Sequence, residues 1–113
     1  KWGTQQLMTD TAYFSAMTNT SNTYNKSYGY LWWLNGKSSM MAPGSAAVYP
    51  VSLSASAPAD MIAALGKGDK KVYVIPGLDL VVVRHGDDTG DAVLGPSSFD
   101  ETFWAKLKLA IKY

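Results

Sequence analysis

The side chains that could do chemistry in this chain are few, and their spacing restricts what they could do. His85 is the single histidine, and no serine or carboxylate lies in a pattern that would make it a catalytic base. Asp87, Asp88 and Asp91 could approach a cation, but their spacing does not fit an EF-hand loop, so a solvated turn is the default interpretation. The absence of cysteine excludes disulfides, thiolate zinc sites and a cysteine nucleophile. We therefore expect neither a metal nor a cofactor.

The stretch over residues 62–84 is the most informative part of the chain. It begins with apolar residues, is interrupted by Gly66-Lys67-Gly68, and continues as two apolar runs joined by Pro76-Gly77. The two glycines could let the backbone approach a substrate closely, or they could form a bulge. Their spacing does not match a phosphate-binding loop. Lys67 could face an acidic ligand group or could lie in solvent.

An antiparallel sheet would position this stretch. Residues 61–64 are predicted to form a strand, and residues 72–75 and 78–84 are predicted to pair across the turn dipeptide Pro76-Gly77. Because residues 80–83 do not alternate with polar residues, we expect this strand to be covered on both faces and to lie centrally in the sheet.

A further strand is predicted before the sheet-forming stretch. Residues 28–34 are aromatic and apolar, and Asn35-Gly36 is a turn signal that would end the strand. Trp32 and Trp33 would point to opposite faces, and we expect both to lie in the core. Residues 37–60 predict a long irregular excursion with at most a short strand at 47–49, and a loop of this length is usually functional or covers something.

Helices are predicted near both ends of the chain. Thr9 or Asp10 can cap a short helix that runs to about Met17. Ser98 with Glu101 fits a capping box, which predicts a closing helix to about residue 112. Its apolar face comprises Phe103, Leu107, Ala110 and Ile111. An antiparallel sheet with a short N-terminal helix and a flanking C-terminal helix is an α+β fold.

Length and charge set the limits of the functional classes. The 113 residues suffice for one domain, or form part of one, and an apolar content of 47% is typical of a globular protein. A net charge of +1 gives no reason to expect nucleic acid or an anionic membrane as a partner. No apolar run approaches the ~18 residues that indicate a membrane span.

Several motifs together resemble a known enzyme family. They are Trp2 with Gln6-Leu7, Tyr13-Phe14 and Met17, then the run Ser27-Tyr28-Gly29-Tyr30-Leu31-Trp32-Trp33-Leu34-Asn35-Gly36, and finally residues 63–76 and 78–84. In order and spacing they resemble the later part of the β-lactamase-related serine hydrolases, which include class C β-lactamases, DD-peptidases, esterases and 6-aminohexanoate-dimer hydrolases. The resemblance implies the late half of a β-lactamase-like α/β domain and a bacterial protein, with a periplasmic or other extracytoplasmic location favoured.

The resemblance also identifies what the chain lacks. The family acts through a serine in Ser-x-x-Lys with a Tyr-x-Asn element as partner. No serine here has lysine three positions on, and no tyrosine has asparagine two positions on. Since both elements normally precede the region of resemblance, the chain is interpreted as a C-terminal fragment that is inactive alone. Its expected partners are the missing N-terminal part, or a second copy, and the full protein would cleave a small-molecule ester or amide.

The family also uses a backbone N–H on the strand beside the active site to complete its oxyanion hole. Counting back from Pro76 without gaps places this element at residues 61–66 and makes Ala64 the best candidate for the donor, with an ordinary strand residue as the alternative. The resemblance further implies substrate contacts from Leu65, Gly66, Lys67 and Gly68. The usual Gly-Gly-Gln is replaced here by Gly68-Asp69-Lys70.

An alternative of a different class is a free-standing, non-catalytic binding or structural domain that associates through its sheet edge. Both interpretations predict association. If the core is shared with a missing part, apolar strand faces such as Tyr73 and residues 81–83 should be exposed.

Overall fold

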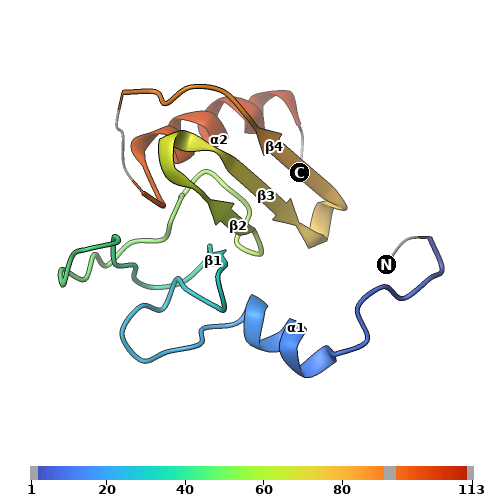
Figure 1. Ribbon diagram of the computed structural model, residues 1–113. Helices are drawn as coiled ribbons and strands as arrows, with labels where there is room; N and C mark the ends of the chain where they lie inside the picture. Colours follow the sequence, from blue (N-terminus) through green and yellow to red (C-terminus); the bar gives the residue numbers. More distant parts are fainter. Residues whose placement is uncertain (1–2, 91–93, 112–113) are drawn as a thin grey trace.

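A computed structural model describes residues 3–90 and 94–111 of the chain. An antiparallel four-stranded sheet with the strand order β1-β2-β3-β4 forms its centre (Figure 1). The elements in chain order are α1 (Thr11–Thr18), β1 (Trp33–Leu34), β2 (Ile62–Leu65), the 3-10 turn η1 (Lys67–Asp69), β3 (Lys71–Ile75), the 3-10 turn η2 (Pro76–Leu78), β4 (Leu80–Arg84) and α2 (Ser98–Ala110). The predicted α+β fold is confirmed.

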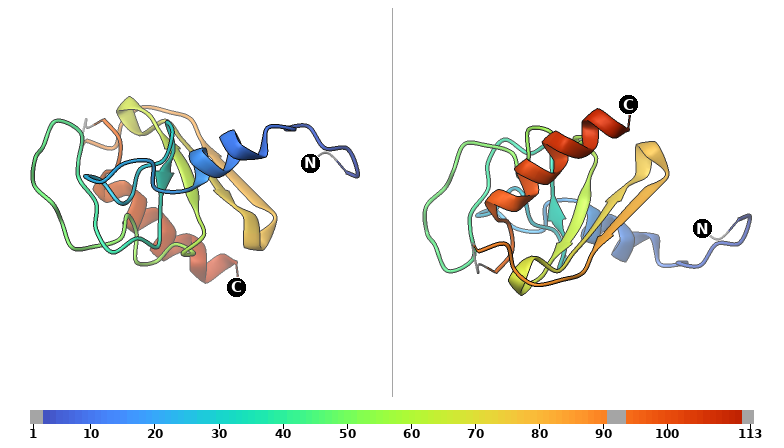
Figure 2. Two further views of the ribbon diagram at one scale, coloured as in Figure 1. Left: turned by 90° about the horizontal axis from the view of Figure 1, so that it is seen from below. Right: turned by 90° about the horizontal axis from the view of Figure 1, so that it is seen from above.

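Helix α2 covers one face of the sheet, whereas α1 lies on the other side of the molecule, beside β1 (Figures 1 and 2). The side chains of β3 alternate between the two faces of the sheet, and this explains how α2 packs on one of them. Lys71, Tyr73 and Ile75 are buried, while the residues between them are half-buried. Trp104 of α2 meets Tyr73 edge-on, with 5.5 Å between the ring centroids. The core under α2 comprises Trp33, Met61, Ala63, Leu65, Tyr73, Ile75 and Trp104.

The predicted strand over residues 28–34 is mostly wrong. Only Trp33 and Leu34 are in a strand, because the chain reverses on itself just before them. The Gly29 N–H donates to the Trp32 carbonyl at 2.8 Å, and Leu31 occupies the left-handed region with φ 63°. Trp33 lies in the core as expected, but Trp32 is only half-buried.

The predicted central position of the last strand is also wrong. β4 is an edge strand, and its residues alternate between half-buried and exposed. Val81 and Val83 are 58% and 54% exposed, so the unbroken apolar run reflects an uncovered apolar face. The expected exposure is therefore confirmed for these two valines. It is wrong for Tyr73, whose side chain α2 covers completely, and for Val82, which is half-buried and packs against the core.

The helix boundaries follow their caps. Asp10 caps α1 as predicted, since its carboxylate accepts from the Tyr13 N–H at 2.8 Å. In α2 the capping box is formed by Ser97 and Asp100, one residue earlier than the predicted pair, because the Asp100 carboxylate reaches back to the Ser97 N–H at 2.8 Å.

The apolar face of α2 agrees only in part with the prediction. Phe103, Leu107 and Ile111 pack against the core as expected, whereas Ala110 is exposed. Trp104, which the helical pattern did not single out, is the residue of α2 that is buried completely. The predicted end of the helix at residue 112 lies outside the described residues.

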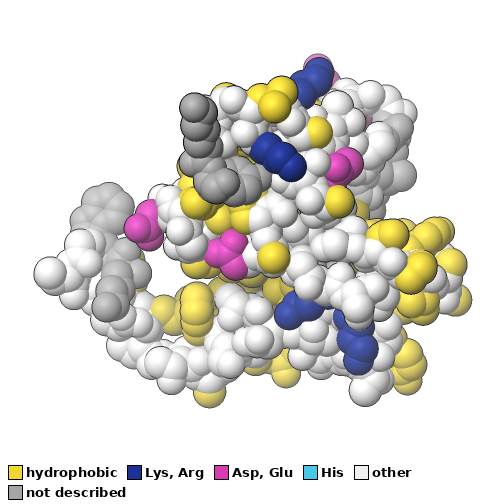
Figure 3. Space-filling model, turned by 180° about the vertical axis from the view of Figure 1, so that it is seen from behind, with side chains coloured by type: hydrophobic (Ala, Val, Ile, Leu, Met, Phe, Trp, Pro, Cys, Tyr) yellow, Lys and Arg dark blue, Asp and Glu magenta, His cyan; other side chains and the backbone are white. Residues whose placement is uncertain are grey.

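The excursion over residues 37–60 is held by Asn35, which is buried rather than a simple turn residue. Its Nδ2 donates to the carbonyls of Ser54 and Pro58 at 3.0 Å, and its Oδ1 accepts from the Ser52 hydroxyl at 2.7 Å. The predicted strand at 47–49 is reduced to one bridge between Met40 and Tyr49. At the end of the molecule formed by this excursion, apolar side chains gather on the surface (Figure 3).

Candidate functional site

The end of β2 borders a hollow of about 340 Å³. Of the five residues predicted to contact substrate, the structure places Ala64, Leu65 and Gly66 in its wall. Lys67 and Gly68 lie in the following turn η1, and within the described residues they take no part in the wall. The remaining wall residues are Tyr28, Leu31, Trp33, Lys70, Lys71, Val72, Arg84 and His85.

The register of the sheet decides where the backbone N–H groups of β2 point. The Gly66 N–H donates to the Lys70 carbonyl at 2.8 Å, so these residues form a hydrogen-bonded pair. Opposed residues in an antiparallel ladder alternate between hydrogen-bonded and non-hydrogen-bonded pairs. Ala64 and its partner Val72 are therefore hydrogen-bonded as well, and the Ala64 N–H points into the sheet.

Leu65 has the opposite orientation. It faces Lys71 as a non-hydrogen-bonded pair, so its N–H points away from β3 and toward the side of β1. In the described structure β1 pairs with β2 at Ala63 and Ile62, and the chain turns away at Leu31 before it reaches Leu65. The Leu65 N–H thus points out of the β2–β3 ladder and Leu65 lies in the wall of the hollow, so the register favours Leu65 over Ala64 as a backbone donor to a ligand.

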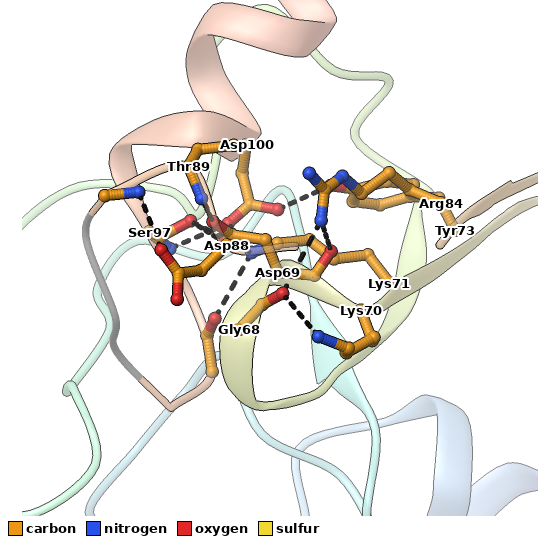
Figure 4. A network of polar contacts seen from close by, with 12 residues as sticks. Gly68, Asp69, Lys70, Lys71, Tyr73, Arg84, Asp88, Thr89, Ser97 and Asp100 are labelled. Carbon is orange, nitrogen blue, oxygen red and sulfur yellow. Dashed lines mark hydrogen bonds and ion pairs between the residues drawn. The ribbon is translucent and has the colours of Figure 1, made fainter. Parts of the chain in front are cut away.

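A buried polar network lies beside this hollow, and sequence reasoning missed it (Figure 4). The Lys71 side chain is fully buried between two carboxylates, with Nζ 2.9 Å from Asp100 Oδ2 and 3.1 Å from Asp69 Oδ1. Tyr73 donates its hydroxyl to Asp100 at 2.6 Å. We call Asp69, Lys71, Tyr73 and Asp100 the buried network.

Side chains from neighbouring segments donate the remaining hydrogen bonds to the Asp69 carboxylate. The hydroxyls of Thr89 and Ser97 donate to its two carboxylate oxygens at 2.6 and 2.7 Å. Arg84 donates to the Asp69 main-chain carbonyl at 2.9 Å, and its guanidinium lies 5.1 Å from the Phe99 ring centroid. The network therefore fastens the loop after β4 and the start of α2 to the sheet, and its polar atoms are occupied by one another rather than presented to a ligand.

The electrostatics of the network agree with a structural role. Burial would raise the pKa of the Asp69 carboxyl, but the hydrogen bonds from Thr89, Ser97 and Lys71 outweigh burial and hold this pKa well below its usual range. Burial, together with the adjacent Asp100 carboxylate, raises the pKa of the Tyr73 phenol far above its usual range. The phenol stays protonated and acts as a hydrogen-bond donor.

The depressed pKa of Asp69 predicts a specific sensitivity to acid. Because the folded state binds this proton less tightly than the unfolded state, the stabilisation is present above the unfolded pKa of about 4 and is lost as the pH falls below it. Urea unfolding between neutral and acidic pH should show a free energy of unfolding that depends less on pH in Asp69→Asn than in the wild type. The largest difference in slope expected is about 1.4 kcal/mol per pH unit.

A matched control for the acid experiment is Asp79→Asn, which removes one charge at an exposed position. It should keep the pH slope of the wild type. Equal slopes for wild type and Asp69→Asn would contradict the assignment of acid sensitivity to Asp69.

The other candidates from the sequence are placed less favourably. His85 is exposed at the rim of the hollow. Asp88 accepts from the Gly90 N–H at 3.1 Å, as expected for a turn, and Asp91 lies outside the described residues. Within the described residues, no group of three or more His, Cys, Asp or Glu side chains could hold a metal ion.

One signal in the sequence could have revealed the network. Lys71 precedes Tyr73 by two residues and Ile75 by four. Because side chains alternate between the two faces of a strand, this spacing alone places the charge of Lys71 on the buried face, where it requires carboxylate partners. The partners themselves, which come from η1 and α2, follow only from the three-dimensional arrangement.

Comparisons with protein-family models, with curated proteins and with solved structures give no match to this chain. Among its described helices, none combines the length and apolar character needed to cross a membrane.

Proposed function

We propose that the chain is the C-terminal portion of a serine hydrolase related to the β-lactamases, and that it is inactive without the remainder of that enzyme. The observation that supports this proposal best is the Leu65 N–H, which points out of the β2–β3 ladder at a residue that lines an open hollow. The family resembled here completes its oxyanion hole with a backbone donor on the corresponding strand, and a backbone donor does not depend on the identity of its side chain.

In this proposal the chain provides one wall of the active site. The Leu65 N–H donates to the oxyanion, and Gly66, where an added Cβ would lie 3.1 Å from the Lys70 carbonyl oxygen, keeps the turn after β2 close to the start of β3. The missing N-terminal part provides the serine, whose Oγ bonds to the carbonyl carbon while the ester or amide leaving group departs with a proton. Water then attacks the acyl-enzyme, releases the acid and restores the serine.

The first experiment compares the 113-residue chain with the full polypeptide encoded by its gene. The pure chain should hydrolyse a chromogenic ester or β-lactam no faster than buffer and should resist a serine-directed fluorophosphonate, whereas the full polypeptide should react with both. Hydrolysis by the pure chain that the fluorophosphonate abolishes would contradict the proposal, as would a full polypeptide with no labelled serine.

A backbone substitution tests the donor itself in the full polypeptide. Replacing the Leu65 N–H by an ester oxygen keeps the side chain and removes the outward donor, so kcat should fall about 10²–10³-fold. The same replacement at Ala64 removes a hydrogen bond inside the sheet and should lower stability more than kcat. An unchanged kcat for the Leu65 ester would exclude this donor.

A second candidate function is a free-standing binding or structural domain that associates through its sheet edge. The open edge of β4, with Val81 and Val83 exposed, favours it. A cooperative thermal transition of a stable 113-residue product, encoded without any upstream Ser-x-x-Lys, would support this function over the hydrolase.

A further inference from the structure

A second hollow adjoins the candidate site, near the start of α2. Its volume is about 440 Å³, which is within the range of small-molecule sites in proteins. It shares three wall residues with the first hollow, namely Tyr28, Trp33 and Leu65. The two hollows therefore meet at Leu65, the residue whose N–H points out of the β2–β3 ladder. We call the larger one the apolar hollow.

The two hollows extend toward different faces of the sheet. Leu65 packs in the core under α2, so the side chain of the preceding Ala64 lies on the opposite face. Ala64 lines the first hollow and, among the described residues, is absent from the wall of the apolar hollow. Leu94 and Gly95, which directly precede α2, line the apolar hollow instead. A ligand held at the Leu65 N–H therefore has space toward both faces.

The wall of the apolar hollow is uncharged. Tyr28 and Trp33 meet edge-on, with 4.9 Å between their ring centroids, and form its aromatic side. Among the described residues, no charged side chain and no histidine lines it, whereas lysine, arginine and histidine side chains line the first hollow. Its further large apolar side chains are those of Met41, Pro43 and Leu94.

The walls are held in place by contacts within the chain. The Asn25 side chain holds the main chain of Met41, because its Nδ2 donates to the Met41 carbonyl at 3.0 Å and its Oδ1 accepts from the Met41 N–H at 3.2 Å. Gly95 has a φ of +86°, and an added Cβ would lie 2.9 Å from Trp33 Cζ2 and 3.0 Å from Pro43 Cγ. Glycine thus lets the segment before α2 lie close to both side chains, and the hollow needs no ligand to form.

We propose that the apolar hollow binds the acyl group of the substrate, and that this group is uncharged, apolar and at least as large as an aromatic ring. The inference rests on the proposed function, in which the Leu65 N–H binds the carbonyl oxygen. The leaving group takes up a proton as it departs, and the side chains that most often supply protons line the first hollow. The acyl group needs no proton, so it suits the apolar hollow, and the rings of Tyr28 and Trp33 favour an aromatic group there.

Two esters with the same leaving group test the acyl assignment in the full polypeptide. Relative to the uncatalysed rates, kcat/KM for p-nitrophenyl phenylacetate should exceed that for p-nitrophenyl acetate about tenfold or more. Leu94→Asp places a charge in the wall at an exposed position and should remove most of this preference. Val48→Asp is the matched control, because Val48 is also 58% exposed but lies outside the wall, and it should keep the preference.

A second measurement does not depend on hydrolysis. In the 113-residue chain, phenylacetamide should shift the NMR signals of the Met41 and Leu94 methyl groups and of the Trp33 indole N–H, whereas acetamide at the same concentration should not. Leu94→Asp should lose the shift at Trp33 and should keep the signal of the buried Trp104 indole, which reports that the variant is folded.

The outcomes separate the two proposals. A full polypeptide that hydrolyses neither ester, with phenylacetamide still bound next to Trp33, would overturn the proposed function and the acyl role and would support an apolar binding site alone. Hydrolysis without the phenylacetyl preference, or with a preference that Leu94→Asp leaves unchanged, would overturn the acyl assignment and leave the hydrolase standing. A chain in which phenylacetamide shifts none of these signals would refute binding in the apolar hollow.

Discussion

Replacing Lys71 by methionine should lower the free energy of unfolding by about 3–5 kcal/mol, although methionine is close to lysine in size. Lys71 is the cation between the buried Asp69 and Asp100, and its side chain has no exposed surface. Removing it leaves two carboxylates facing each other in a site from which water is excluded. Removing one partner of a buried ion pair is costly because the remaining charge keeps its desolvation penalty.

The adjacent lysine provides a matched control. Lys70 is exposed, and among the described residues its Nζ reaches only the Gly68 carbonyl, at 3.3 Å. Lys70→Met makes the same chemical change one residue earlier and should alter the free energy of unfolding by less than about 0.5 kcal/mol. Urea unfolding at neutral pH measures both variants. Similar values for the two would show that the buried network does not stabilise the fold.

Replacing Trp104 by alanine should cost about 3–5 kcal/mol of unfolding free energy. Trp104 is fully buried at the centre of the layer between α2 and the sheet, and it meets the rings of Tyr73 and Phe103 edge-on at 5.5 and 5.8 Å. Truncation would leave a cavity, because α2 is already fixed to the sheet through Asp100 and has little freedom to move inward.

Two controls separate the causes of this loss. Within the described structure, the buried Trp104 Nε1 has no hydrogen-bond partner, so Trp104→Phe removes volume without breaking a hydrogen bond and should cost less than the alanine variant. Leu109→Ala, in the same helix but 82% exposed, should change the stability by less than about 0.5 kcal/mol. A Leu109→Ala effect equal to that of Trp104→Ala would contradict the assigned packing.

Local rules predicted the parts of this fold that local chemistry determines. The pair β3 and β4 followed from two apolar runs around Pro76-Gly77, and α1 from a capping side chain with helical spacing after it. The failures occurred where tertiary structure overrides propensity. Residues 28–34 have strong strand propensity, yet the chain reverses at Leu31, and an apolar strand predicted to be central is the edge strand β4.

The sequence indicated a segment to consider for a site, and the structure shows which of its backbone N–H groups point out of the sheet ladder. Counting back from Pro76 located the end of β2 and its following turn, and the hollow is indeed bordered by Ala64, Leu65 and Gly66. Which N–H faces outward depends on the pairing register, because a shift of one residue turns every N–H to the other side of the strand. The sequence contains no signal that fixes this register, whereas the Gly66–Lys70 hydrogen bond does.

The most direct test of the hydrolase proposal is the intact mass of the native polypeptide that contains these residues, measured after labelling with a serine-directed fluorophosphonate. We expect a mass well above 12.2 kDa, increased by one label, with the labelled serine in a Ser-x-x-Lys sequence upstream of residue 1. A native, unlabelled polypeptide of 12.2 kDa would contradict the account and would leave the binding domain as the function to pursue.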